Sequence, residues 1–129
     1  MVIKAIMCDV DGTLLNDEGY VSPFTIEMIK KAKEQGILFG LCTGRDVDSV
    51  KTLLETWGVN NIVDIIVGTG GAEIYDYILG IDKSNYPLDG ALIQDIINHY
   101  EGMDLNFAIP YEGILYAPKA VSYTHLTLP

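Results

Sequence analysis

Basic residues are scarce in this sequence. Lysine and arginine together number 8 against 18 aspartates and glutamates, which gives a formal net charge of −10 at pH 7. Such a charge opposes binding to the phosphate backbone of nucleic acid and to an anionic membrane surface. We therefore expect neither as a partner. A phosphorylated ligand would have to be held by local donors and a metal ion rather than by the field of the whole protein.

Cysteines and long apolar runs are also lacking. The two cysteines, Cys8 and Cys42, lie at the ends of predicted strands, where a thiol is typically a small buried hydrophobe in a reducing cytosol. No stretch has the length and flanks of a transmembrane helix or a signal peptide, so we expect a cytoplasmic chain. Apolar residues make up 49% of the 129 residues, which is enough to bury a globular core.

Two carboxylates follow the first apolar run. Residues 2–8 are apolar except for Lys4 and predict a short buried strand. Asp9 and Asp11 come next, and Gly12 lets the chain turn and bring its backbone close to a ligand. Two such carboxylates repel each other unless a cation or a shared proton relieves them, and Mg²⁺ prefers carboxylate and phosphate oxygens. The alternative is an acidic turn that only caps the strand.

Helices and strands then alternate along the chain. The sequence indicates a helix over 23–35 with Ser22 as N-cap, a strand over 37–42, a helix over 46–57 that buries Trp57, and a strand over 62–67. This alternation predicts a parallel sheet with right-handed crossovers. Ligands of such sheets bind at the carboxyl ends of the strands, where Asp9, Asp11 and Thr43 all fall.

The turn after the second strand carries a second group of polar residues. The hydroxyl of Thr43, with the amides of Gly44 and of the following helix N-terminus, can hold a phosphate oxygen. A Thr-Gly turn is also common in ordinary loops. Arg45 either binds phosphate in a bidentate manner or forms a salt bridge with Asp46 or Asp48, and the sequence favours neither.

Both turns resemble signatures of one superfamily. Asp-Val-Asp-Gly-Thr-Leu at 9–14 resembles the first signature of the haloacid dehalogenase superfamily, and Thr-Gly-Arg at 43–45 resembles the second. The resemblance implies a Rossmann-like three-layer α/β fold around a parallel sheet, and a Mg²⁺-dependent phosphatase. It also implies that Asp9 is the nucleophile that forms an aspartyl-phosphate, that Asp11 is the general acid/base, and that both hold Mg²⁺. The implied phosphate-binding residues are Gly12, Thr43, Gly44 and Arg45.

A glycine-rich turn follows the third strand. Gly-Thr-Gly-Gly-Ala-Glu at 68–73 predicts a strand end, a flexible turn and a return strand, and it lacks the Lys-Ser/Thr and the helix of a P-loop. It resembles the "NGA" segment of the Cof-type branch of the superfamily, which leads through a hairpin into an inserted cap. Gly70 stands where the family has Asn, so we carry over no substrate contact from that side chain.

The rest of the chain has the pattern of the opening of an α/β cap. A linker over 79–86 precedes a helix capped by Asp89, and strand-like runs follow at 105–109 and 113–116, with Pro110 and Glu112 in the turn. We expect residues 1–81 to form the first half of the core and 82–120 part of the cap. Residues 121–129 form a tail that continues no periodicity and whose origin the sequence leaves open.

Two parts of the family's site are missing from the sequence. Members supply a lysine and an acidic Gly-Asp signature after the cap, and we assign neither Lys83 nor Lys119 that role. Because phosphoryl transfer depends on neutralising charge around the transferred group, we expect the chain as given to be a weak catalyst or inactive.

The favoured function is hydrolysis of a small phosphorylated metabolite, such as a sugar phosphate. The alternatives are a non-catalytic phosphate- or metal-binding module and a phosphomutase of the same superfamily. The sequence leaves the substrate and the oligomeric state open.

Overall fold

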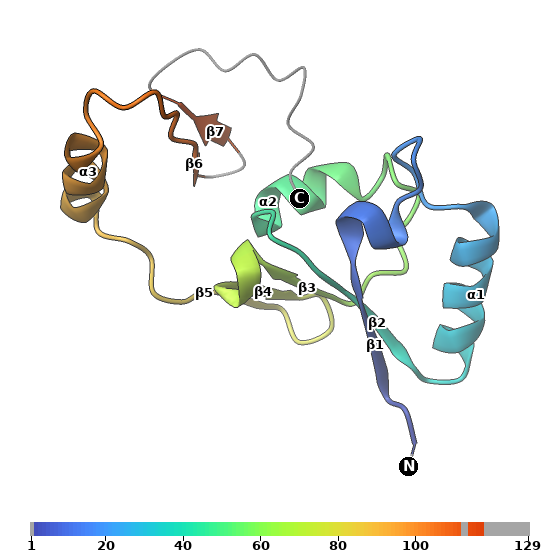
Figure 1. Ribbon diagram of the computed structural model, residues 1–129. Coiled ribbons are helices and arrows are strands. Elements are labelled where there is room, and N and C mark those ends of the chain that lie inside the picture. The colour runs from blue at the N-terminus through green and yellow to red at the C-terminus, as the bar shows by residue number, and fades with distance from the viewer. Residues whose placement is uncertain (1, 112–113, 118–129) are drawn as a thin grey trace. The chain divides into compact units, whose positions relative to one another are not determined.

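A computed structural model describes residues 2–111 and 114–117 (Figure 1). The chain forms two compact units, which we call unit 1 (Met1–Asn85) and unit 2 (Tyr86–Pro129). The elements of unit 1 are β1 (Ala5–Asp9), the turn η1 (Val10–Leu14), α1 (Pro23–Glu34), β2 (Leu38–Cys42), α2 (Val47–Leu53), β3 (Ile65–Gly68), the turn η2 (Thr69–Gly71), β4 (Glu73–Asp76) and β5 (Ile81–Ser84). Those of unit 2 are α3 (Gly90–His99), β6 (Ile109–Tyr111) and β7 (Ile114–Tyr116). Within the described ranges, no helix is long and apolar enough to cross a membrane.

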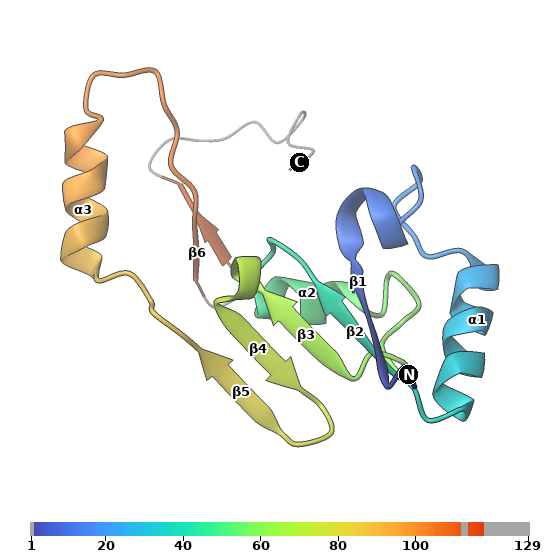
Figure 2. The ribbon, with the colours of Figure 1, turned by 60° about the horizontal axis from the view of Figure 1, so that its bottom comes forward.

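The strands of unit 1 form one sheet in the order β1-β2-β3-β4-β5 (Figure 2). β1, β2 and β3 are parallel, as the alternation predicted, but β4 runs antiparallel to β3 and β5 antiparallel to β4, so the sheet is mixed. The prediction of a linker over 79–86 is wrong at its centre, which forms β5. The segment is too polar to show a strand periodicity. It forms a strand because its backbone pairs with the edge of β4, which would otherwise have unpaired N–H and C=O groups.

Local signals predicted α1 well. The Ser22 hydroxyl accepts a hydrogen bond from the Thr25 N–H at 3.1 Å, Pro23 occupies the first helical position, and Gly36 lies just past the end. In contrast, α2 is shorter than the predicted helix over 46–57. The helix ends at Leu53 and is followed by turns, in one of which the Gly58 N–H donates to the Glu55 carbonyl at 2.9 Å. Trp57 is nevertheless in the core, with 4% of its surface exposed, as predicted.

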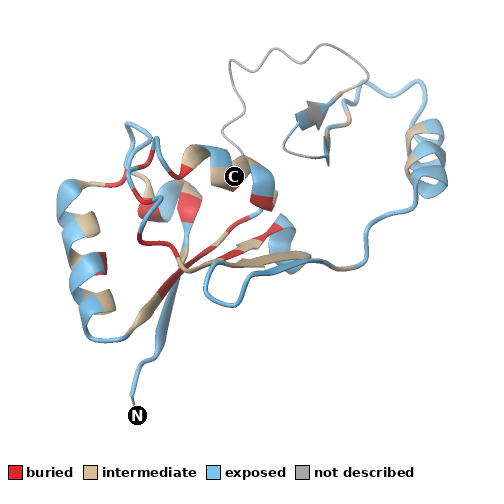
Figure 3. Ribbon diagram, turned by 180° about the vertical axis from the view of Figure 1, so that it is seen from behind, coloured by how far each residue is buried: buried red, intermediate tan, exposed pale blue. Residues whose placement is uncertain are grey.

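The core lies on one face of the sheet. Phe39, Leu41 and Ile66 are buried and share that face, because side chains alternate along a strand and Leu41 pairs with Ile66. Ile29 of α1 and Val50 of α2 belong to the same hydrophobic cluster, so both helices cover this face. In Figure 3 the buried residues, drawn in red, lie in unit 1. Of the three layers expected, the described residues supply the sheet and one helical layer.

The described residues of unit 2 form no comparable core. No residue of unit 2 whose burial is described is buried, and Leu92 and Ile96 of α3 are exposed. The cap of α3 is as predicted, since the Asp89 carboxylate accepts a hydrogen bond from the Ala91 N–H at 2.8 Å. Pro110 lies within β6 rather than in the turn, and the first strand begins at Ile109 rather than at residue 105. Glu112, Lys119 and the tail over 121–129 lie outside the described residues.

Candidate functional site

The two signature turns lie at the same end of the sheet. Asp9 is the last residue of β1 and pairs in register with Cys42, the last residue of β2. Thr43 follows directly, and its N–H donates to the Val67 carbonyl of β3 at 2.9 Å. Because β1, β2 and β3 are parallel, the η1 turn and the Thr43–Arg45 loop both leave the sheet at its carboxyl edge.

The η1 turn holds its polar residues between two buried anchors. Val10 and Leu14 are buried, and the Leu15 N–H closes the turn on the Val10 carbonyl at 3.1 Å. Gly12 has a φ of +76°, and a Cβ there would meet nothing within 4 Å, so the turn requires glycine for its conformation and not for space. The Thr13 hydroxyl donates to Asp9 Oδ2 at 3.0 Å, which fixes the orientation of the exposed carboxylate.

The Thr43–Arg45 loop is fixed by its own threonine. Thr43 is buried, with 8% of its surface exposed, and its Oγ1 accepts a hydrogen bond from the Arg45 N–H at 3.2 Å. Its hydroxyl hydrogen is thereby left to donate to another acceptor. Gly44, between them, is exposed. The loop therefore presents a hydroxyl donor and an exposed backbone segment beside the end of β2.

A bidentate ion pair joins the two turns. Arg45 Nε and Nη2 donate to Asp11 Oδ2 and Oδ1, each at 2.8 Å, so the partner of Arg45 is neither Asp46 nor Asp48. The hydrogen bond from Arg45 and its positive charge outweigh partial burial and lower the pKa of Asp11. The same hydrogen bond raises the pKa of Arg45. The guanidinium also lies 5.9 Å from the centre of the Trp57 ring, which limits its freedom.

Two carboxylates occupy the N-terminus of α2. The Val47 N–H donates to Glu73 Oε2 at 2.8 Å, and the Ser49 N–H donates to the capping Asp46 carboxylate, also at 2.8 Å. The expectation that amides of this helix N-terminus bind phosphate is therefore not met by Val47 or Ser49. Sequence reasoning assigned no role to Glu73. Its only signal was an acidic side chain directly after a glycine-rich turn, and its partner lies 26 residues away.

The predicted metal ligands are Asp9 and Asp11. Within the part of the chain that the structure describes, no group of three or more His, Cys, Asp or Glu residues is placed to hold a metal ion. Asp9 supplies a carboxylate oxygen, a donor that Mg²⁺ takes when substrate and water complete its shell, whereas both carboxylate oxygens of Asp11 accept hydrogen bonds from Arg45. Cys8, next to Asp9 in the chain, is a half-buried free thiol. Its burial, and to a smaller extent the negative charge of Asp9, raise the pKa of this thiol. A thiol held in its neutral form is a poor ligand.

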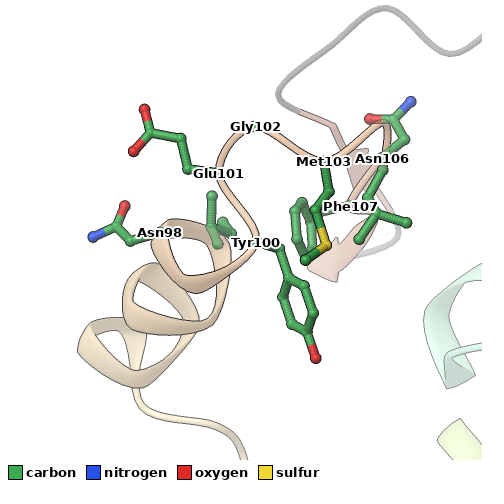
Figure 4. Close-up of a pocket in the computed structure, with 9 residues that line it drawn as sticks. Asn98, Tyr100, Glu101, Gly102, Met103, Asn106 and Phe107 are labelled. Atoms are coloured by element: carbon green, nitrogen blue, oxygen red, sulfur yellow. The ribbon is translucent and has the colours of Figure 1, made fainter.

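A cavity of about 210 Å³ lies in unit 2, away from all of these residues in the sequence. Figure 4 shows Asn98 and Glu101 directed away from Met103 and Phe107, which lie on its apolar side. No residue predicted for the site lines it.

Comparisons with known proteins find a matching family, similar sequences and similar structures. The model of one protein family, the haloacid dehalogenase-like hydrolases, matches residues 6–127. The chain is 40% identical over 74 residues to the 5-amino-6-(5-phospho-D-ribitylamino)uracil phosphatase YwtE of Bacillus subtilis, covering 57% of this chain and 24% of that protein. It is 35% identical over 75 residues to a phosphoglycolate phosphatase of Thermoplasma volcanium, covering 58% of this chain and 32% of that protein.

A solved structure is similar over most of the chain. A haloacid dehalogenase-like hydrolase from B. subtilis superposes with a TM-score of 0.75 at 26% identity, covering 92% of this chain and 40% of that one. The chain thus spans less than half the length of this structure, and a quarter to a third of the length of the two curated relatives.

Proposed function

Since the chain belongs to the haloacid dehalogenase-like hydrolases, in their Cof-type branch, we propose that it carries the phosphoryl-transfer half of a Mg²⁺-dependent phosphatase that hydrolyses a small phosphorylated metabolite. One observation carries the proposal. The turn that holds Asp9 and Asp11 and the loop that holds Thr43 leave adjacent parallel strands in register, and the Arg45–Asp11 ion pair joins them directly.

Asp9 is the nucleophile in this proposal. One of its carboxylate oxygens accepts the Thr13 hydroxyl at 3.0 Å, which leaves the other to attack phosphorus. Attack forms an Asp9–O–P bond and breaks the bond from phosphorus to the substrate oxygen, giving an aspartyl-phosphate that water then hydrolyses. The Thr43 hydroxyl and the exposed loop at Gly44 bind the oxygens of the phosphoryl group.

Asp11 is the general acid and base. Paired with Arg45, it is held as a carboxylate, the form that accepts a proton from water. To protonate the leaving oxygen, Asp11 must first separate from Arg45 and take up a proton from water, and Arg45 then becomes free to bind phosphate. Bound at Asp9 and Asp11, Mg²⁺ would neutralise charge on the phosphoryl oxygens.

The substrate class follows from the relatives. Two of them are named for different phosphorylated metabolites, a phosphorylated ribitylamino-uracil and phosphoglycolate. A shared phosphate and differing leaving groups suit a site in which residues of unit 1 bind the phosphoryl group, whichever leaving group it carries. A sugar phosphate is a second candidate of this class.

The test compares the chain with Asp9→Asn. With Mg²⁺ present, we expect beryllium fluoride, which mimics a phosphoryl group on a carboxylate, to bind the chain in a 1:1 complex seen by ¹⁹F NMR. Asp9→Asn removes the nucleophile and should abolish this signal, and EDTA should abolish it in the original chain. Equal signals from both chains would contradict the proposal.

Turnover separates the remaining alternatives. Release of inorganic phosphate from an aryl phosphate, lost in Asp9→Asn, identifies a phosphatase. Beryllium fluoride binding without turnover of any phosphate ester identifies a binding module. Transfer of the phosphoryl group to a second position of the substrate, without phosphate release, identifies a mutase.

A further inference from the structure

The glycine-rich turn after β3 makes repeated contact with the Thr43–Arg45 loop. The Thr69 N–H donates to the Arg45 carbonyl at 2.8 Å, and the Gly70 N–H donates to the Thr43 carbonyl at 3.2 Å. In Figure 2 this turn lies at the end of β3, beside the segment that leads from β2 into α2. Both carbonyls of the loop that flank Gly44 are therefore bound from the same turn.

The turn can approach this closely because Gly68 has no side chain. A Cβ at Gly68 would lie 2.9 Å from the Arg45 carbonyl oxygen and 3.0 Å from the Val47 nitrogen. Thr69 next to it adopts a φ of +49°, a left-handed conformation that threonine rarely takes. A conformation of this cost persists only where its surroundings hold it, and here its N–H is the donor to Arg45.

Glu73 closes the contact from the far side of the turn. It is the first residue of β4 and pairs with Gly68 in the sheet, which directs its carboxylate to the start of α2. There Oε2 accepts the Val47 N–H at 2.8 Å. An anion is favoured at a helix N-terminus. Yet the negative charge of Glu73 next to the loop opposes a bound phosphate. Glu73 therefore contributes by holding the loop in position and not by attracting the ligand.

We propose that Glu73 is a positioning residue, which acts through the Val47 N–H and together with the turn over 68–71 to hold the Thr43–Arg45 loop in the geometry that binds the phosphoryl group. The inference rests on the proposed function of that loop. It assigns a role to the glycine-rich turn, to which the proposed catalytic steps assign none. It also explains why a carboxylate stands close to a loop that binds an anion.

The experiment compares Glu73→Leu with Glu73→Gln. Leucine fills similar space without an acceptor, whereas glutamine keeps an oxygen acceptor and loses the charge. Asp76→Leu is the matched control, because Asp76 lies at the opposite end of the same strand and its carboxylate accepts the Ile78 and Leu79 N–H groups at 2.8 and 2.9 Å. Amide hydrogen exchange of Val47, Thr69 and Gly70 is measured by NMR, with titration of inorganic phosphate in the presence of Mg²⁺.

In Glu73→Leu we expect the Val47 amide to exchange about tenfold faster, as for loss of a hydrogen bond to a charged acceptor, and phosphate to bind several-fold more weakly. Glu73→Gln should restore the exchange rate and bind phosphate as tightly as the original chain or more so, since the acceptor remains and the repulsion is gone. Asp76→Leu should alter neither the Val47 exchange rate nor the phosphate affinity, even if it lowers the melting temperature as much as Glu73→Leu does.

Two results would overturn the inference. One is unchanged Val47 exchange and phosphate affinity in Glu73→Leu, and the other is a glutamine variant as impaired as the leucine variant. If the original chain binds no phosphate at all, the proposed function of the loop fails, and the role of Glu73 in enzyme action fails with it. Altered exchange in Glu73→Leu would then show only that Glu73 holds the loop.

Discussion

At the scale of single residues, the pairing of Arg45 with Asp11 decides the charge state of the candidate site. Both side chains are about one-third exposed, so water screens the pair only in part. The bidentate geometry, with two bonds of 2.8 Å, favours the carboxylate form of Asp11. In the free protein, Asp11 is therefore a proton acceptor, and Arg45 is engaged before any phosphate arrives.

The first prediction concerns pH. Because folding lowers the pKa of Asp11 from its usual value of about 3.9, the pair stabilises the fold above that pH, and this stability is lost as pH falls through the lowered pKa. Arg45→Met should therefore be less stable than the original chain at neutral pH, and the difference should shrink at acid pH. Urea unfolding of the metal-free chain in EDTA, repeated along this range, measures it.

Arg45→Lys serves as the control for that measurement. Lysine keeps the positive charge but cannot form the bidentate fork, so it should restore part of the stability at neutral pH. A stability difference between the original chain and Arg45→Met that is the same at every pH would contradict the prediction.

At the scale of elements, the sequence predicts what local chemistry decides. Ser22, Pro23 and Gly36 mark both ends of α1, and the apolar runs that lead into Asp9 and Thr43 mark β1 and β2, so the adjacency of the two turns could be inferred. β5 could not, because its four residues gain their strand conformation only from β4.

Long-range side-chain partners are equally hidden from the sequence. Arg45 had two acidic neighbours in the chain, yet it pairs with an aspartate 34 residues away. The sequence indicates no partner for Glu73, because only the fold brings the start of α2 next to the first residue of β4. Local rules place the site at an edge of the sheet, while the contacts inside it depend on the tertiary arrangement.

The second prediction tests a local signal on its own. Ser22→Ala removes the acceptor of the Thr25 N–H at the start of α1, which should cost about 1 kcal/mol of the free energy of unfolding. Ser22→Asp keeps an acceptor and adds a charge that the helix N-terminus favours, so it should be close to the original chain. Urea unfolding at neutral pH measures both. Equal destabilisation by alanine and aspartate would show that the cap does not stabilise α1.

At the scale of the whole molecule, apolar burial is uneven. Within the described residues, all the buried apolar side chains lie between Val10 and Ile66, and they form a single cluster. The described part of unit 2 consists of one helix and one short hairpin, a combination that is too small to exclude water from the apolar side chains of α3. Among the described residues, the apolar burial that stabilises the fold therefore lies in unit 1.

The third prediction follows from this distribution. A chain ending at Asn85 keeps all the described buried residues and the whole five-stranded sheet, so it should unfold cooperatively with a midpoint close to that of the full chain. Circular dichroism during urea unfolding measures this. Ile66→Val, which removes one methyl group from the centre of the cluster, should lower the stability of both chains equally, by about 1 kcal/mol. If the shorter chain loses its cooperative transition, or if Ile66→Val destabilises only the longer chain, unit 2 contributes to a core that the burial of its described residues does not reveal.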